Sequence, residues 1–155
     1  MAPGLIALVA ALAVAVVTGL AWQRTNGRIR GIGSAPAAGT PEVSAADGAA
    51  VAAGPMLTSV ELGLPLGQRA TLVQFSTAFC APCRATRRIL AEVAGMVDGV
   101  AHVEIDAESH LDLVRRLDIR RTPTVLVVGP DGRIAKRASG QPRKADVIAA
   151  VGDLS

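Results

Sequence analysis

Apolar and polar residues follow different periods along the C-terminal part of the chain. Residues 71–75 and 123–128 are near-continuous apolar runs, which is typical of strands buried on both faces. Residues 101–106 alternate between apolar and polar, so they predict a half-buried strand. Residues 84–97 place apolar side chains three and four positions apart and predict an amphipathic helix. Strands and helices therefore interleave, as they do in an α/β domain.

Turn and capping residues place the shorter elements of a domain that spans residues 57–155. Ser109, with Asp112 three positions on, predicts a capping box at the start of a short helix. The Gly, Pro, Asp and Gly at positions 129–132 predict a turn, and the basic residues after it suit an edge strand. The remaining predicted elements are a strand over residues 57–62, the edge strand over 133–138 and a final helix over 142–151.

The first 30 residues have a different character. Residues 3–23 carry no charge and are mostly aliphatic, which matches the roughly 20 apolar residues of a membrane-spanning helix. We expect an uncleaved anchor that contacts lipid through this segment. The alternative is a cleaved signal peptide, but no Lys or Arg precedes the apolar run. Arg24, Arg28 and Arg30 follow it, and by the positive-inside rule they favour the cytoplasm over the exterior for the C-terminal domain.

Composition divides the chain into three parts and limits its partners. Residues 1–30 form the predicted anchor with its basic flank, residues 31–56 a flexible linker rich in Ala, Gly and Pro, and residues 57–155 the folded domain. Aromatic residues make up only 2% of the chain, so a stacking platform for single-stranded nucleic acid is absent. We therefore expect no nucleic-acid partner.

Both cysteines of the chain stand between a predicted strand and a predicted helix, at positions 80 and 83. A thiol at a helix start faces unpaired backbone N–H groups and the positive end of the helix dipole, which favour the thiolate. A zinc site needs about four ligands, and the chain adds only His102 and His110, so we expect no metal. A purely structural disulfide is the other alternative, although so short a loop constrains the unfolded chain weakly. The spacing thus favours a redox-active pair.

These features resemble the thioredoxin family over residues 57–155. The matching motifs are, in order, Val73-Gln74-Phe75, Phe79-Cys80-Ala81-Pro82-Cys83, Val103-Glu104-Ile105-Asp106, Thr122-Pro123-Thr124 and Gly140. The resemblance implies a thioredoxin-like α/β fold, in which helices flank a central mixed sheet, preceded here by one N-terminal transmembrane helix. The interval from Cys83 to Pro123 lacks the extra insertion that membrane-tethered reductases of cytochrome maturation carry.

The resemblance also implies a role for each matching residue. Cys80 is expected to be the exposed attacking thiolate and Cys83 the shielded resolving thiol. The expected substrate-binding residues are Phe79, Ala81, Pro82, Thr122 and Pro123, the last of them a cis proline.

The chain departs from the family's pattern around these residues. Phe79 and Ser76 replace two usual tryptophans. The family's buried Asp aligns with Gln74, which cannot take a proton, and the Lys beside it aligns with His102. We take Gln74 and His102 as the candidate proton relay for Cys83, because neutral imidazole accepts a proton near pH 7. A strand histidine without a catalytic part is the alternative.

The sequence therefore predicts a thiol–disulfide oxidoreductase at the membrane, most simply a protein-disulfide reductase. Its expected partners are disulfide-bonded proteins and a reductant, either a thioredoxin reductase or a membrane dithiol carrier. No organic cofactor is expected. Two alternatives stay open: a redox-silent adaptor that binds peptides at the cis-proline groove, and a dedicated reductase for cytochrome c maturation.

Overall fold

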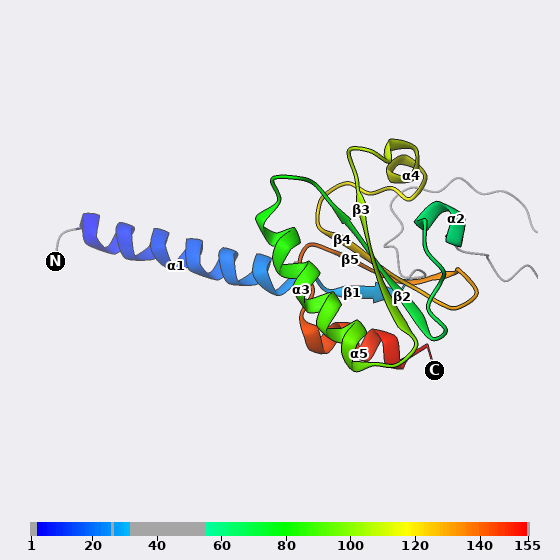
Figure 1. Cartoon of the computed structure of the whole chain (residues 1–155). Coiled ribbons are helices and arrows are strands. Elements are labelled where there is room, and N and C mark those ends of the chain that lie inside the picture. The colour runs from blue at the N-terminus through cyan, green and yellow to red at the C-terminus, as the bar shows by residue number, and fades with distance from the viewer. Residues whose placement is uncertain (1–2, 26, 32–54, 155) are drawn as a thin grey trace, which may run out of the picture.

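The computed structural model describes residues 3–25, 27–31 and 55–154, with the side chains of the first helix described from residue 7 to residue 21. The strands are β1 (Ile29–Gly31), β2 (Ala70–Ser76), β3 (Val100–Asp106), β4 (Thr124–Val128) and β5 (Ile134–Ser139). The helices are α1 (Pro3–Thr25), α2 (Ser59–Leu62), α3 (Ala81–Met96), α4 (Leu111–Arg116) and α5 (Lys144–Gly152). Within the described ranges the strands form one mixed sheet in the order β1-β5-β4-β2-β3 (Figure 1). The predicted α/β fold is confirmed.

The strand that leads to the cysteines, β2, lies in the interior of the sheet. It pairs in parallel with β3 and antiparallel with β4. Every residue of β2 is buried, as a near-continuous apolar run requires when both faces of a sheet are covered. The β2–β3 register places Gln74 directly opposite Glu104. Polar side chains of the two strands thus meet near the end of β2 from which the chain continues to the cysteines.

The hydrophobic core has two halves, one on each face of the sheet. In one half, α2 and α4 pack against the face that carries Val103 and Ile105, the alternating positions of β3. In the other half, Leu90 and Val93 of α3 pack together with residues of β2, β4 and α5. Both side chains are fully buried, and burying one such side chain contributes about 1.5–3 kcal/mol. This packing holds α3, and with it the helix start that carries the cysteines, against the sheet.

The strand predicted over residues 57–62 is wrong, because these residues form the short helix α2. The backbone N–H of Thr58 donates to the Glu61 carboxylate at 2.9 Å, and the backbone N–H of Glu61 donates to the Thr58 hydroxyl at 3.3 Å. This reciprocal pair is a capping box. Gly63 ends the helix with φ 67°, in the left-handed region that glycine adopts without strain. The secondary structure of this segment is therefore determined by local hydrogen bonds and not by its apolar residues.

The segment before α4 also differs from its prediction. The Ser109 hydroxyl donates to the Asp106 carboxylate, whereas the residue at the N-cap of α4 is His110, which makes no side-chain capping bond. Asp112 instead pairs with Arg115 on the helix surface. The capping box predicted there is absent because the nearer carboxylate takes the serine hydroxyl.

The predicted turn over residues 129–132 is confirmed, but the strand after it is not at the edge of the sheet. The Gly132 N–H donates to the Gly129 carbonyl at 3.0 Å and closes the turn. The strand β5 is covered by β1, which pairs with it antiparallel, Ile29 opposite Ala138. A segment as short as β1 shows no readable period, so the sequence did not indicate it.

The N-terminal part of the chain corrects the sequence prediction most clearly. In the part of the chain that the structure describes, no helix is long and apolar enough to cross a membrane, so the spanning helix predicted over residues 3–23 is not borne out. The linker predicted over residues 31–56 lies for the most part outside the described residues.

The turn between α1 and β1 ties the N-terminal segment to the domain. The Gly27 N–H donates to the Ser139 carbonyl at 2.9 Å. A Cβ at Gly27 would lie 1.9 Å from the carbonyl oxygen of Gln141, and Gly27 has φ 78°, so only glycine fits. The chain from Gly27 to the end of β1 is therefore part of the folded sheet.

Candidate active site

The two cysteines lie where β2 ends and α3 begins. Cys80 is the N-cap of α3, and Pro82 lies in the first turn, where its missing N–H leaves no helical hydrogen bond unmade. The backbone N–H of Cys83 points at the sulfur of Cys80, with a distance of 3.2 Å between N and Sγ. The strand–helix junction predicted for this pair is confirmed. In the reduced protein the same N–H and the helix dipole stabilise a thiolate at Cys80.

The two sulfur atoms form a disulfide but differ in accessibility. The S–S distance is 2.06 Å and the Cα atoms lie 5.2 Å apart. Cys80 is partly exposed, whereas Cys83 is only 2% exposed. A second disulfide approaching from solvent therefore meets the sulfur of Cys80 first.

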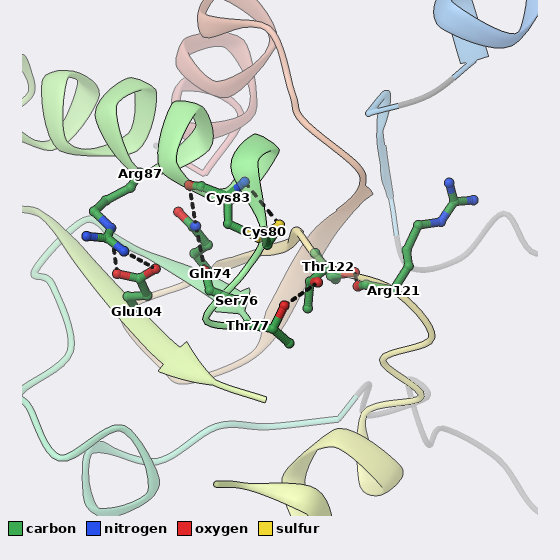
Figure 2. Close-up of a disulfide and its surroundings, with 10 residues drawn as sticks. Gln74, Ser76, Thr77, Cys80, Cys83, Arg87, Glu104, Arg121 and Thr122 are labelled. Atoms are coloured by element: carbon green, nitrogen blue, oxygen red, sulfur yellow. Dashed lines mark hydrogen bonds and ion pairs between the residues drawn. A yellow bond between two sulfur atoms is a disulfide. The ribbon is translucent and has the colours of Figure 1, made fainter. Parts of the chain in front are cut away.

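One side of the disulfide is formed by the loop that precedes β4. The peptide bond between Thr122 and Pro123 is cis, as the resemblance implied. The hydroxyl oxygens of Thr122 and Thr77 lie 3.3 Å apart and point toward one another, which joins this loop to the segment before the cysteines (Figure 2). The Gly140 N–H donates to the Pro123 carbonyl at 2.7 Å and holds the loop from behind. All the groups named here are uncharged.

The residues next to Cys80 add an exposed rim to this side. Phe79 is 99% exposed, and both Ala81 and Pro82 are exposed as well. Thr122 lies beside Thr77, two positions before Phe79. The residues predicted to contact a substrate chain therefore lie around the accessible sulfur.

The opposite side of the disulfide is a charged hollow of about 370 Å³ that borders both cysteines. Its lining residues are Ser76, Thr77, Ala78, Cys80, Cys83, Arg84, Arg87, Glu104 and Asp106. The Arg87 guanidinium pairs with the Glu104 carboxylate through two contacts, Nε to Oε2 at 2.7 Å and Nη2 to Oε1 at 3.0 Å (Figure 2). Sequence reasoning missed this pair. A signal for it was present in the sequence. Glu104 and Asp106 are the polar positions of the alternating strand β3, and they lie opposite Gln74 and Ser76 at the end of β2.

Comparison with known proteins identifies the family of this domain. The family model for thioredoxin matches residues 64–153. The chain belongs to the thioredoxin family. Thioredoxin H5 of Oryza sativa subsp. japonica is 28% identical over 72 residues, which cover 46% of this chain and 53% of that protein. The thioredoxin of Staphylococcus saprophyticus subsp. saprophyticus is 29% identical over 80 residues, which cover 50% of this chain and 77% of that protein. The chain thus spans about half the length of the first relative.

Solved structures agree with this assignment. Chloroplastic thioredoxin z is 31% identical with a TM-score of 0.51, over 56% of this chain and 79% of that chain. The oxidized form of mitochondrial thioredoxin 3 from Saccharomyces cerevisiae is 18% identical with a TM-score of 0.52, over 61% of this chain and 88% of that chain. The second likeness shows the fold alone.

Gln74, one of the two residues predicted to relay protons, is fully buried beneath Cys83 in this thioredoxin domain. Its Nε2 donates to the Cys83 carbonyl at 2.9 Å and to the Ser76 hydroxyl at 2.7 Å (Figure 2). Its Oε1 is buried, and no described residue donates a hydrogen bond to it. An amide side chain does not take up a proton from a thiol. Gln74 therefore does not relay protons, and its bond to the Cys83 carbonyl positions the first turn of α3.

His102, the other predicted relay residue, lies on β3 opposite Leu72 and does not line the hollow. Burial lowers the pKa of His102; the Glu104 carboxylate opposes this effect and the Arg87 guanidinium adds to it. Its Nε2 is buried and finds no hydrogen-bond partner among the described residues. The structure therefore does not bring His102 into contact with the cysteines.

Proposed function

We propose that this protein is a thiol–disulfide oxidoreductase that reduces disulfide bonds in protein substrates through Cys80 and Cys83. One observation carries the proposal: within a thioredoxin domain, the two cysteines form a disulfide with one accessible sulfur at a helix start and one buried sulfur. A structural disulfide has no need for an accessible sulfur on the positive end of a helix. A nucleophile does.

The reaction follows in two exchange steps. The Cys80 thiolate attacks one sulfur of the substrate disulfide, so a bond from Cys80 to the substrate forms and the substrate disulfide breaks. The departing substrate thiolate takes a proton. Cys83 then loses its proton and attacks the Cys80 sulfur, which releases the second substrate thiolate and restores the Cys80–Cys83 disulfide. Two electrons pass from the protein to the substrate.

The uncharged side of the disulfide is the surface that we propose for the substrate chain. The exposed Phe79 ring offers an apolar contact next to Cys80. The backbone of Thr122 offers hydrogen-bonding groups to an extended chain, which would add to the protein as a strand. The contact between Thr122 and Thr77 keeps this loop at a constant distance from the reactive sulfur.

Turnover needs a reductant for the disulfide that each cycle leaves behind. We propose a thioredoxin reductase or a membrane dithiol carrier, and the choice depends on the compartment. We propose the cytoplasm, where thiols are kept reduced and a thioredoxin reductase is the matching donor. A C-terminal fusion to alkaline phosphatase, which folds only where disulfides form, is expected to be inactive. An active fusion would indicate the exterior and the dithiol carrier.

Insulin reduction driven by dithiothreitol tests the proposed activity. The full chain is expected to accelerate precipitation of the insulin B chain, and the Cys80→Ser variant is not. A redox-silent adaptor, the alternative function, would bind peptides but leave the precipitation rate at that of dithiothreitol alone. That outcome would overturn the proposal.

A further inference from the structure

The second exchange step requires a proton to leave a buried thiol. Cys83 is only 2% exposed, so bulk water has little direct access to its sulfur. The polar side chain nearest to it in the hydrogen-bond network, Gln74, is an amide that binds the Cys83 carbonyl and does not take protons. An ionised thiol is the nucleophile in disulfide exchange. The proton of Cys83 therefore needs another acceptor.

The charged hollow supplies a path from Cys83 to a carboxylate. Cys83, Glu104 and Asp106 all line it, and its volume of about 370 Å³ holds several water molecules. Asp106 is already engaged, because its carboxylate accepts hydrogen bonds from the Ser109 hydroxyl and the Glu108 N–H. These bonds stabilise its ionised form and lower the pKa of Asp106. Both carboxylates thus already accept hydrogen bonds, and their places in the β2–β3 register distinguish them.

Glu104 is the better placed carboxylate. It stands opposite Gln74 in the β2–β3 register, at the level of the amide that holds the Cys83 carbonyl. Its side chain is 27% exposed, so the carboxylate is in contact with water at the rim of the hollow. A general base can act through water, and the hollow that both residues line connects Cys83 with Glu104.

Arg87 fixes the direction of this carboxylate. It lies four positions after Cys83 on α3, so the two residues share one face of the helix. Its two contacts with Glu104 form a bidentate ion pair, which fixes the orientation of the carboxylate. The same helix thus carries the thiol that loses the proton and the guanidinium that aims the acceptor.

We propose that Glu104 accepts, through water in the hollow, the proton that Cys83 loses when it attacks Cys80, and that Arg87 is the positioning residue for this transfer. The inference rests on the proposed function. In the step, the S–H bond of Cys83 breaks and the proton passes to the Glu104 carboxylate. The Cys83 sulfur then bonds to Cys80, and the substrate thiolate leaves and takes a proton from solvent.

Other charged and titratable groups face the same hollow or lie next to it. They are Arg84 and Arg87 on α3, Asp106 and His102 on β3, and Cys80 at the helix start, whereas β2 contributes the neutral Gln74 and Ser76. The two guanidinium groups favour the thiolate of Cys83 once it forms. His102 is the competing acceptor, and Asp106 is the competing carboxylate.

Stopped-flow reaction of the reduced full chain with 5,5′-dithiobis(2-nitrobenzoate) separates the two steps. The first release of thionitrobenzoate reports attack by Cys80, and the second reports resolution by Cys83. Each phase is measured over a series of pH values for the wild-type chain and for Glu104→Gln, Arg87→Gln, His102→Gln and Asp106→Asn. The last two variants are the controls for the competing acceptors.

Glu104→Gln is expected to slow the second phase roughly tenfold to a hundredfold and to flatten its pH dependence, with the first phase unchanged. Arg87→Gln keeps the carboxylate but removes the two contacts that orient it, so the second phase is expected to slow less than in Glu104→Gln and to keep its pH dependence. His102→Gln and Asp106→Asn are expected to leave both phases at the wild-type rates.

Three outcomes would overturn the inference. The first is a second phase in Glu104→Gln that matches the wild-type rate and pH profile. The second is a slower second phase in His102→Gln or Asp106→Asn with Glu104→Gln unaffected. The third is an equal slowing in Glu104→Gln and Arg87→Gln with unchanged pH profiles, which would make the ion pair merely structural. If the wild-type chain shows neither phase, the proposed function fails and the inference falls with it.

Discussion

Cys80 and Cys83 share one bond, yet they lie in two different environments. Cys80 borders the charged hollow on one side, and on its other side it has an open surface with the exposed Phe79 ring and the two threonine hydroxyls. The surroundings of Cys83 are closed on the sheet side by Gln74 and charged on the hollow side. If the proposed roles hold, a single turn of helix separates recognition of a substrate from transfer of a proton.

The geometry of the helix start produces this contrast. Cys80 is the N-cap, with an extended backbone (φ −90°, ψ 98°), so it lies before the helix proper. Cys83 belongs to the helix and starts the stripe that packs on the sheet, which continues through Thr86 and Leu90. Residues three and four apart share one helix face, so burial of that stripe also buries Cys83.

The largest effect is expected when each cysteine is replaced by serine. Cys80→Ser is expected to abolish insulin reduction, because the accessible nucleophile is lost. Cys83→Ser is expected to retain the first exchange step and to accumulate a mixed disulfide with the substrate, which mass spectrometry of the trapped complex detects. Labelling of reduced protein with limiting iodoacetamide serves as the control, and modification of Cys83 ahead of Cys80 would contradict the assignment.

A second test compares two buried polar side chains around Cys83. Gln74→Leu removes the donor to the Cys83 carbonyl and the Ser76 hydroxyl, and leaving these groups unpaired is expected to cost about 1–3 kcal/mol of unfolding free energy. Thr86→Val is the matched control. The Thr86 hydroxyl is buried with no hydrogen-bond partner among the described residues, so its removal is expected to be neutral or stabilising. Urea unfolding measures both, and equal losses would refute the distinction.

A third, smaller effect is expected on the side of Cys80. Phe79→Ala removes an exposed apolar contact, so KM for insulin is expected to rise severalfold, while unfolding free energy stays within about 0.5 kcal/mol of wild type. The reaction with 5,5′-dithiobis(2-nitrobenzoate), which needs no bound chain, is the control and is expected to be unchanged. An equal loss with both substrates would mean that Phe79 acts on Cys80 itself.

The smallest effect is expected from His102 and concerns pH. Its pKa is lowered in the folded protein, chiefly by burial, so the unfolded chain binds a proton at a pH where the folded chain does not. Stability is therefore lost as pH falls below the unfolded value of about 6.5 toward the folded pKa. His102→Gln is expected to reduce this loss between about pH 7 and pH 5 in urea unfolding. An identical pH dependence in wild type and variant would show that His102 makes no contribution.

Regular patterns in the sequence were sufficient to predict the long strands and helices of the fold. The apolar run of β2 and the helical spacing of α3 each extend over enough residues to be read without the rest of the chain. Together they place the Cys80–Cys83 pair at a strand–helix junction. Residues 57–62 were misread because Thr58 and Glu61 decide that segment through two local hydrogen bonds, a signal that the sequence contained.

The sequence by itself determined the Cys-x-x-Cys pair, its position at a helix start and the resemblance to the family. The resemblance also implied that Cys80 is the exposed and Cys83 the shielded cysteine, in agreement with the observed burial. Only the tertiary structure decided that β1 covers β5 and that Arg87 meets Glu104 across the hollow. Glu104 stands opposite Gln74 because of the β2–β3 register, and a slip of one residue would turn it to the other face of the sheet. Strand register and contacts between elements arise from packing between residues far apart in the chain, and no local pattern encodes them.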